Sequence, residues 1–146
     1  MRWTIIATGK PAIGWAKQGI EDYLSRLQRT GTVDCVYVRD GSPDDVTKRM
    51  LIASAGSLRV LLDERGKQHR SKGLAQWIEA RQLEGCKRVS VLIGGANGHS
   101  PALKEGVKES WALSVMTLQH ELALLVLMEQ LYRAHSILRG EPYHRE

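Results

Sequence analysis

Two stretches of the sequence carry residues whose types and spacing could do chemistry. The first is the glycine-rich segment Gly94-Gly95-Ala96-Asn97-Gly98, which follows a mostly apolar run at 89–93 and precedes Ser100-Pro101. Ser100 is suited to cap a helix and Pro101 to its first turn, so the segment predicts a strand, a loop and a helix start. Such a junction brings bare backbone N–H groups up to a ligand. A tight turn with positive φ would explain the same glycines without a ligand.

The second stretch is the end of the chain, where Tyr143, His144 and Arg145 follow one another. Tyrosine can stack on a base, histidine can carry or move a proton, and arginine can hold a phosphate, so these residues could contact RNA. Fraying is the ordinary behaviour of a chain end and is the alternative. Arg133 follows Glu129 by four residues, which fits either a helical ion pair or a functional role.

Charge and composition narrow the class of partner. The net charge of +5 and the pI near 9.4 favour an acidic partner such as nucleic acid, although many proteins with this charge bind none. Half of the residues at 63–72 are Lys, Arg or His, which suits either a solvated loop or a surface for a phosphate backbone.

Cys35 and Cys86 lie far apart without metal-like spacing, which favours two reduced thiols and predicts no metal site. The longest apolar run, residues 122–128, is too short to span a membrane, so we expect a soluble cytoplasmic protein that does not bind membranes.

The elements that must position these residues alternate along the chain. Hydrophobic periodicity and turn residues predict strands at 3–8, 32–38, 58–62 and 89–93 and helices at 12–29, 42–55, 71–83, 101–109 and 120–138. The apolar segment 111–118 looks extended, either as a fifth strand or as a loop that could wrap a flat aromatic base. This order predicts a single α/β domain over residues 1–146, with a parallel sheet and helices on its faces. Ligands of such sheets bind beyond the carboxyl ends of the strands, here Leu62, Ile93 and Leu118.

The last predicted helix is apolar on every side over residues 122–128. A helix of this kind needs cover all round, and one sheet covers only one side. A second copy of the chain would supply the remaining cover, so we expect a homodimer.

Several motifs together carry a family resemblance that no single one would support. They run in order along the whole chain: Leu92-Ile93-Gly94-Gly95 with Gly98 and Ser100-Pro101; Ser110-Trp111-Ala112-Leu113-Ser114 with Met116-Thr117-Leu118 and His120; Glu129-Gln130-Leu131-Tyr132-Arg133-Ala134; and Pro142-Tyr143-His144-Arg145-Glu146. In these motifs the sequence resembles the ribosomal RNA large subunit methyltransferase H family, a group of small SPOUT-class enzymes.

This resemblance implies a SPOUT-type α/β knot with a C-terminal trefoil knot, a homodimer, and S-adenosyl-L-methionine (SAM) as cofactor. The reaction it implies is methylation of N3 of a pseudouridine in large-subunit (23S) ribosomal RNA. Its substrate-side residues would be Tyr143, His144 and Arg145, completing the site across the dimer, with Arg133 assisting. Loss of the N3 proton needs a base with a pKa near neutral, and His144 is the residue of this chain end that suits it, so we expect His144 to act as the base. The cofactor contacts that it implies are Leu62, Gly94, Gly95, Leu113, Ser114, Val115, Met116, Thr117 and Leu118.

The sequence departs from the family pattern at Gln119, where a proline is frequent, and at Leu124, where an arginine is common. These departures put in question any role for a rigid proline or an arginine at those positions. Two alternatives stay open: a SPOUT methyltransferase with another RNA target, and a non-enzymatic module that binds RNA or the ribosome.

Overall fold

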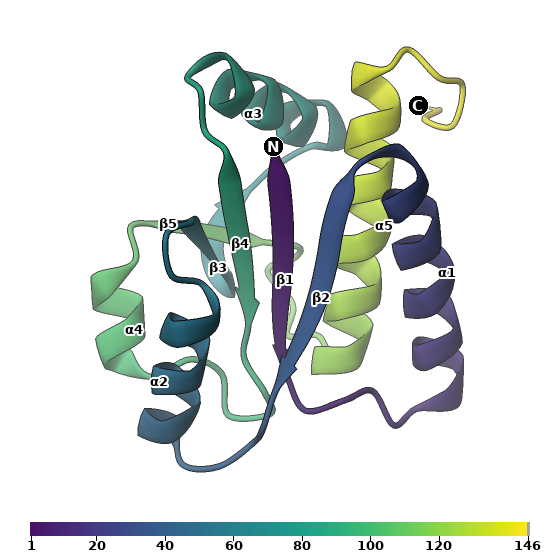
Figure 1. Ribbon diagram of the computed structural model, residues 1–146. Helices are drawn as coiled ribbons and strands as arrows, with labels where there is room; N and C mark the ends of the chain where they lie inside the picture. Colours follow the sequence, from purple (N-terminus) through teal and green to yellow (C-terminus); the bar gives the residue numbers. More distant parts are fainter. Residues whose placement is uncertain (146) are drawn as a thin grey trace.

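The computed structural model describes residues 1–145 and contains one five-stranded sheet with helices packed on it (Figure 1). Strands and helices alternate along the chain, as the periodicity predicted. The strands are β1 (Arg2–Thr8), β2 (Thr32–Val38), β3 (Leu58–Gln68), β4 (Arg88–Ile93) and β5 (Glu109–Ala112). The helices are α1 (Gly14–Thr30), α2 (Pro43–Ala53), α3 (Ser71–Leu83), α4 (Pro101–Gly106) and α5 (His120–Leu138).

The sheet has the strand order β2-β1-β4-β3-β5, and all of these pairs are parallel. Alternate residues of each strand face opposite sides. Ile5 and Val91 pack with residues of α1, α3 and α5 in one core, whereas Ile6 and Leu92 pack with residues of α2 and α4 in another. The sheet therefore has helices on both faces, which confirms the predicted α/β architecture.

Local capping explains where two of the helices begin. The hydroxyl of Ser42 accepts a hydrogen bond from the N–H of Asp45 at 3.2 Å, and the hydroxyl of Ser100 accepts one from the N–H of Leu103 at 3.2 Å. In each case a proline follows the cap, where its missing N–H costs no hydrogen bond. Because α4 starts at a fixed point, it also fixes where the glycine-rich segment ends.

Three element boundaries differ from the sequence prediction. β3 continues to Gln68 because, after a register shift between Leu62 and Lys67, it pairs again with β5, so the predicted loop at 63–72 is partly strand. β5 ends at Ala112, and the segment 113–119 is a loop rather than the end of a fifth strand. α4 ends at Gly106, three residues earlier than predicted, since Gly106 is a poor helix residue.

α5 is the most apolar helix and is partly covered by the sheet, α1 and α3. Leu124, Leu127 and Met128 are buried, and α1 approaches closely where Gly19 faces Leu125. The trefoil knot and the homodimer stay predictions. In the part of the chain that the structure describes, no helix is long and apolar enough to cross a membrane.

Candidate functional site

A cavity of about 530 Å³ lies at the carboxyl ends of β4 and β5 and beside residues 62–64 of β3, where the register of β3 shifts. The register places Leu62 of β3 between Ile93 of β4 and Trp111 of β5, so the segments that follow these three residues meet at one edge. The strand end next to Leu62 is thus Trp111-Ala112, and the prediction that placed it at Leu118 is wrong. The lining includes eight of the nine predicted cofactor residues: Leu62, Gly94, Gly95, Leu113, Ser114, Met116, Thr117 and Leu118.

The glycine-rich loop forms one wall of the cavity by folding back on itself. The N–H of Gly98 donates to the carbonyl of Gly95 at 3.0 Å, and Gly98 has a φ of +70°, which favours glycine. A Cβ on Gly94 would lie 2.7 Å from the carbonyl carbon of Gly98, so only glycine fits there without movement. The glycines thus form the tight turn that was one prediction, and this turn also lines the cavity, as the other prediction expected. The two predictions do not exclude each other.

The loop at 113–119 forms the opposite wall. The hydroxyl of Ser114 accepts a hydrogen bond from the N–H of Met116 at 3.0 Å, and the hydroxyl of Thr117 donates to the carboxylate of Glu64 on β3. Val115 is the one predicted cofactor residue that does not line the cavity, and its side chain is 75% exposed. The loop is thus fastened at Thr117 and presents an apolar tip outward.

The structure shows the roles of Gln119 and Leu124, the two positions at which the sequence departs from the family pattern. The side-chain oxygen of Gln119 accepts hydrogen bonds from the N–H groups of Glu121 and Leu122 at 2.8 and 3.0 Å. Gln119 therefore caps α5, which a proline could not do through its side chain. Leu124 is 2% exposed, so an arginine here would place a charge in the core.

Charged side chains gather at one side of the cavity. Lys104 of α4 lies 3.5 Å from the carboxylate of Asp63, which also accepts a hydrogen bond from the N–H of Arg65 at 3.1 Å. Burial alone would raise the pKa of Asp63, but this hydrogen bond and the Lys104 charge outweigh it and lower the pKa. Burial lowers the pKa of His99, whose Nε2 lies 2.9 Å from the Leu92 carbonyl and donates to it.

The predicted substrate residues form a second cluster, on α5 and the chain end. Arg133 contacts Glu129 at 2.6 Å, which confirms the predicted ion pair, and its guanidinium lies 4.8 Å from the ring centre of Tyr143. The Tyr143 hydroxyl donates to Glu129 at 3.1 Å and lies 2.9 Å from the hydroxyl of Tyr23. Burial, the bond with Tyr23 and the Glu129 charge raise the pKa of Tyr143. Tyr143 and His144 are therefore half-buried against α5 rather than frayed, while Arg145 is exposed.

Arg133 also contacts the imidazole of His144. Nη1 of Arg133 lies 3.2 Å from Nδ1 of His144. Since a guanidinium can only donate, Nδ1 is the acceptor in this hydrogen bond. Arg133 therefore orients the ring of His144.

The cavity and the cluster of predicted substrate residues lie at different positions along α5. His120 and Ala123 line the cavity, whereas Arg133 follows His120 by thirteen residues on the same helix. At 1.5 Å per residue this separates Arg133 from the cavity end of the helix by roughly 20 Å. Within one chain, the structure thus brings Arg133, Tyr143 and His144 together but keeps them away from the cavity.

Several cavity residues were not predicted from the sequence. Asp63, Glu64, His99 and Lys104 all line it. Asp63 and Glu64 directly follow Leu62, which was a predicted contact, so their position after a strand was a usable signal. His99 and Lys104 had no comparable signal, because only the fold of the glycine loop brings them to β3.

Comparison with known proteins identifies the family to which this chain belongs. Residues 1–144 match a family model described as "Predicted SPOUT methyltransferase". The chain belongs to the SPOUT methyltransferase family. This SPOUT methyltransferase is 42% identical over 145 residues to a protein of Thermus thermophilus named ribosomal RNA large subunit methyltransferase H, and the match covers 99% of each chain.

Solved structures agree on the fold at low sequence identity. The SPOUT methyltransferase superposes on a tRNA (m1G37) methyltransferase from Aquifex aeolicus with a TM-score of 0.58 and 12% identity, covering 100% of this chain and 76% of the other. A methyltransferase from Legionella pneumophila, solved with bound SAM, matches with a TM-score of 0.50 and 10% identity over 92% of this chain and 66% of the other. At these identities the likeness concerns the fold alone.

Proposed function

We propose that this SPOUT methyltransferase uses SAM to methylate N3 of a pseudouridine in large-subunit (23S) ribosomal RNA. The observation that carries the proposal is the cavity, which is lined by eight of the nine residues that the resemblance assigns to the cofactor. The full-length relative from Thermus thermophilus, named for large-subunit ribosomal RNA, supports the choice of substrate. The net charge of +5 suits a substrate with a phosphate backbone.

The cavity fits SAM in size and in chemistry. Its volume of about 530 Å³ falls in the range of small-molecule sites, and it is lined by apolar side chains, by the glycine-rich loop and by the charged side chains of Asp63, Glu64 and Lys104. Gly94 and Gly95 would let the cofactor approach the backbone, and Leu62 and the loop at 113–118, Val115 included, would contact it. SAM supplies a methyl group on a sulfonium, which is a good leaving group and needs no metal.

The chain's own residues would then bind, orient and deprotonate the target pseudouridine. Bound SAM would supply the methyl group, and N3 would have to lose its proton to a side chain in order to accept that group. His144 can take that proton at Nδ1 once Arg133 releases it. Arg133 and Arg145 would hold a phosphate of the RNA or stabilise charge on the pseudouridine ring, and Tyr143 would stack on that ring.

These residues can reach the cavity only if a second copy supplies them. Because Arg133 lies roughly 20 Å along α5 from the cavity of its own chain, and His144 contacts Arg133, we propose a homodimer whose sites each combine one chain's cavity with the partner's chain end. Each chain would be one SPOUT domain over residues 1–146, and the enzyme would act on ribosomal RNA in the cytoplasm.

Calorimetry with SAM followed by methyl transfer tests this function. We expect saturable SAM binding, and transfer of labelled methyl groups to large-subunit RNA but not to small-subunit RNA or tRNA. Transfer to another RNA would mean that the enzyme is a SPOUT methyltransferase with a different target. No SAM binding, together with tight RNA binding, would mean that the chain is a non-enzymatic RNA-binding module.

A further inference from the structure

The charges around the cavity are unevenly balanced. Asp63 has a cationic partner in Lys104, at 3.5 Å. Burial lowers the pKa of His99, which favours its neutral form. Glu64 also lines the cavity, but among residues 1–145 no lysine, arginine or histidine forms an ion pair with it. Among these residues the carboxylate of Glu64 therefore has no ion-pair partner, unlike that of Asp63.

Glu64 is held in place by the loop that forms the opposite wall. Oε2 of Glu64 accepts a hydrogen bond from the hydroxyl of Thr117, and both residues line the cavity. This bond fixes one carboxylate oxygen and leaves the other available to a ligand. It also joins β3 to the 113–119 loop, so the carboxylate is positioned by two elements rather than by one flexible side chain.

We propose that Glu64 makes the cavity selective for the cationic methyl donor over its neutral product, and that Thr117 positions Glu64 for this task. The proposal rests on the proposed function, since it assumes that SAM occupies this cavity. SAM carries a positive sulfonium, whereas S-adenosylhomocysteine has a neutral thioether after transfer. A nearby carboxylate attracts the first and not the second, which would favour exchange of product for fresh cofactor.

The size of the effect follows from the exposure of Glu64. Its side chain is exposed, so water and salt weaken its attraction for a cation. We therefore expect loss of the charge to weaken SAM binding by about three- to tenfold, and to change the affinity for S-adenosylhomocysteine by less than about twofold.

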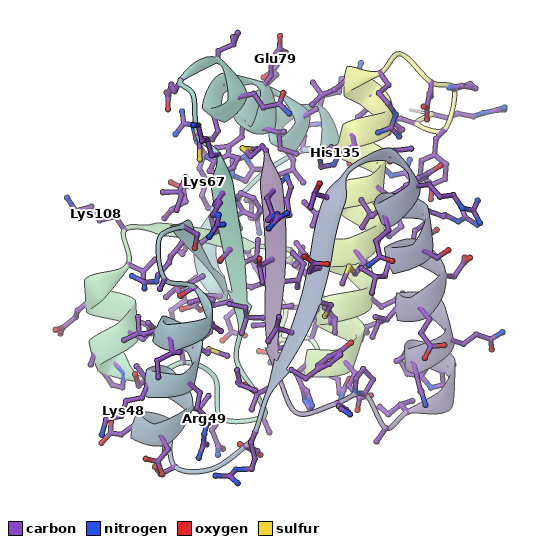
Figure 2. All side chains as sticks on the ribbon, in the orientation of Figure 1. Lys48, Arg49, Lys67, Glu79, Lys108 and His135 are labelled. Carbon is purple, nitrogen blue, oxygen red and sulfur yellow. The ribbon has the colours of Figure 1, made fainter. Side chains whose placement is uncertain are left out.

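Calorimetric titration of four proteins with both ligands tests the proposal. Glu64→Gln removes the charge but keeps an oxygen that can accept from Thr117, whereas Thr117→Val removes the hydroxyl. Glu79→Gln is the matched control, because Glu79 is an exposed residue of α3 at the end of the molecule opposite the carboxyl ends of the strands (Figure 2). We expect Glu64→Gln to weaken SAM selectively, with a smaller loss at high salt, and Thr117→Val to reduce the same selectivity in part.

The outcomes separate this proposal from the proposed function. If wild type binds SAM but the ratio of the dissociation constants for SAM and S-adenosylhomocysteine is unchanged in Glu64→Gln, Glu64 does not discriminate between the two ligands by their charge. The inference is then wrong. An equal loss of affinity for both ligands would also overturn it, because Glu64 would then only fasten the loop. If wild type binds neither ligand, the proposed function itself fails.

Discussion

Replacement of Gly94 by alanine tests the glycine loop as a wall of the SAM cavity. The new Cβ would lie 2.7 Å from the carbonyl carbon of Gly98 and 3.0 Å from its oxygen, and both are backbone atoms. Ordinary contact begins near 3.4 Å, so the loop must move by about 0.7 Å. A Cβ on Gly95 would meet only the side chain of Thr8, at 3.4 Å, which needs no movement. Two neighbouring glycines therefore form a matched pair.

The expected magnitudes follow from this difference. Overpacking of this kind costs about 1–3 kcal/mol of unfolding free energy, which lowers the melting temperature by about 3–10 °C in a chain of this size. A wall displaced by a large fraction of 1 Å should weaken SAM binding by about tenfold or more. For Gly95→Ala we expect an unfolding free energy within about 1 kcal/mol of wild type, because its Cβ displaces no protein atom.

Isothermal calorimetry with SAM and thermal denaturation with and without SAM measure both effects on the same samples. Wild-type affinity in Gly94→Ala would show that the glycine loop is not a wall of the SAM site. An equal loss of unfolding free energy in Gly94→Ala and Gly95→Ala would show that the Cβ contact with Gly98 is not the cause of the instability.

Four further predictions concern the chain end, the dimer and the stability of the fold. His144→Ala should lower the rate of methyl transfer by about 10²–10⁴-fold while SAM affinity stays within about threefold; equal turnover would remove His144 from the mechanism. Mixing His144→Ala with Gly94→Ala protein should restore about one quarter of wild-type activity, since half of the dimers are mixed and each holds one intact site; no recovery would contradict a shared site. Gly66→Ala should lower the unfolding free energy by about 1–3 kcal/mol in a denaturant titration, because its Cβ would lie 2.7 Å from the β5 backbone; unchanged stability would contradict the tight β3–β5 contact. Burial lowers the pKa of His99 and His135, so near and below pH 6.5 the unfolded chain binds more protons than the folded one. The melting temperature should therefore fall as the pH drops below about 6.5, and a constant or rising melting temperature would contradict the burial of these two side chains.

Features encoded by neighbouring residues could be predicted from the sequence. Ser42 and Ser100 are each followed by proline, and both cap their helices as expected, since a cap depends on three or four successive residues. The ion pair between Glu129 and Arg133 was predictable for the same reason.

Features that depend on distant residues were ambiguous or missed. The apolar composition of 113–118 suits a strand, but a strand needs a partner, and the pairing of β3 with β5 ends at Ala112. The contact between Thr117 and Glu64 joins residues that are 53 positions apart, so no local pattern reveals it. The distance between the chain end and the cavity follows from the direction of α5, which only the assembled sheet defines.

Nucleoside mass spectrometry of ribosomal RNA from cells with and without this gene tests the central claim most directly. We predict N3-methylated pseudouridine in large-subunit RNA only when the gene is present, with the unmethylated pseudouridine in its absence. Identical nucleoside profiles in the two RNA samples would contradict the proposed substrate.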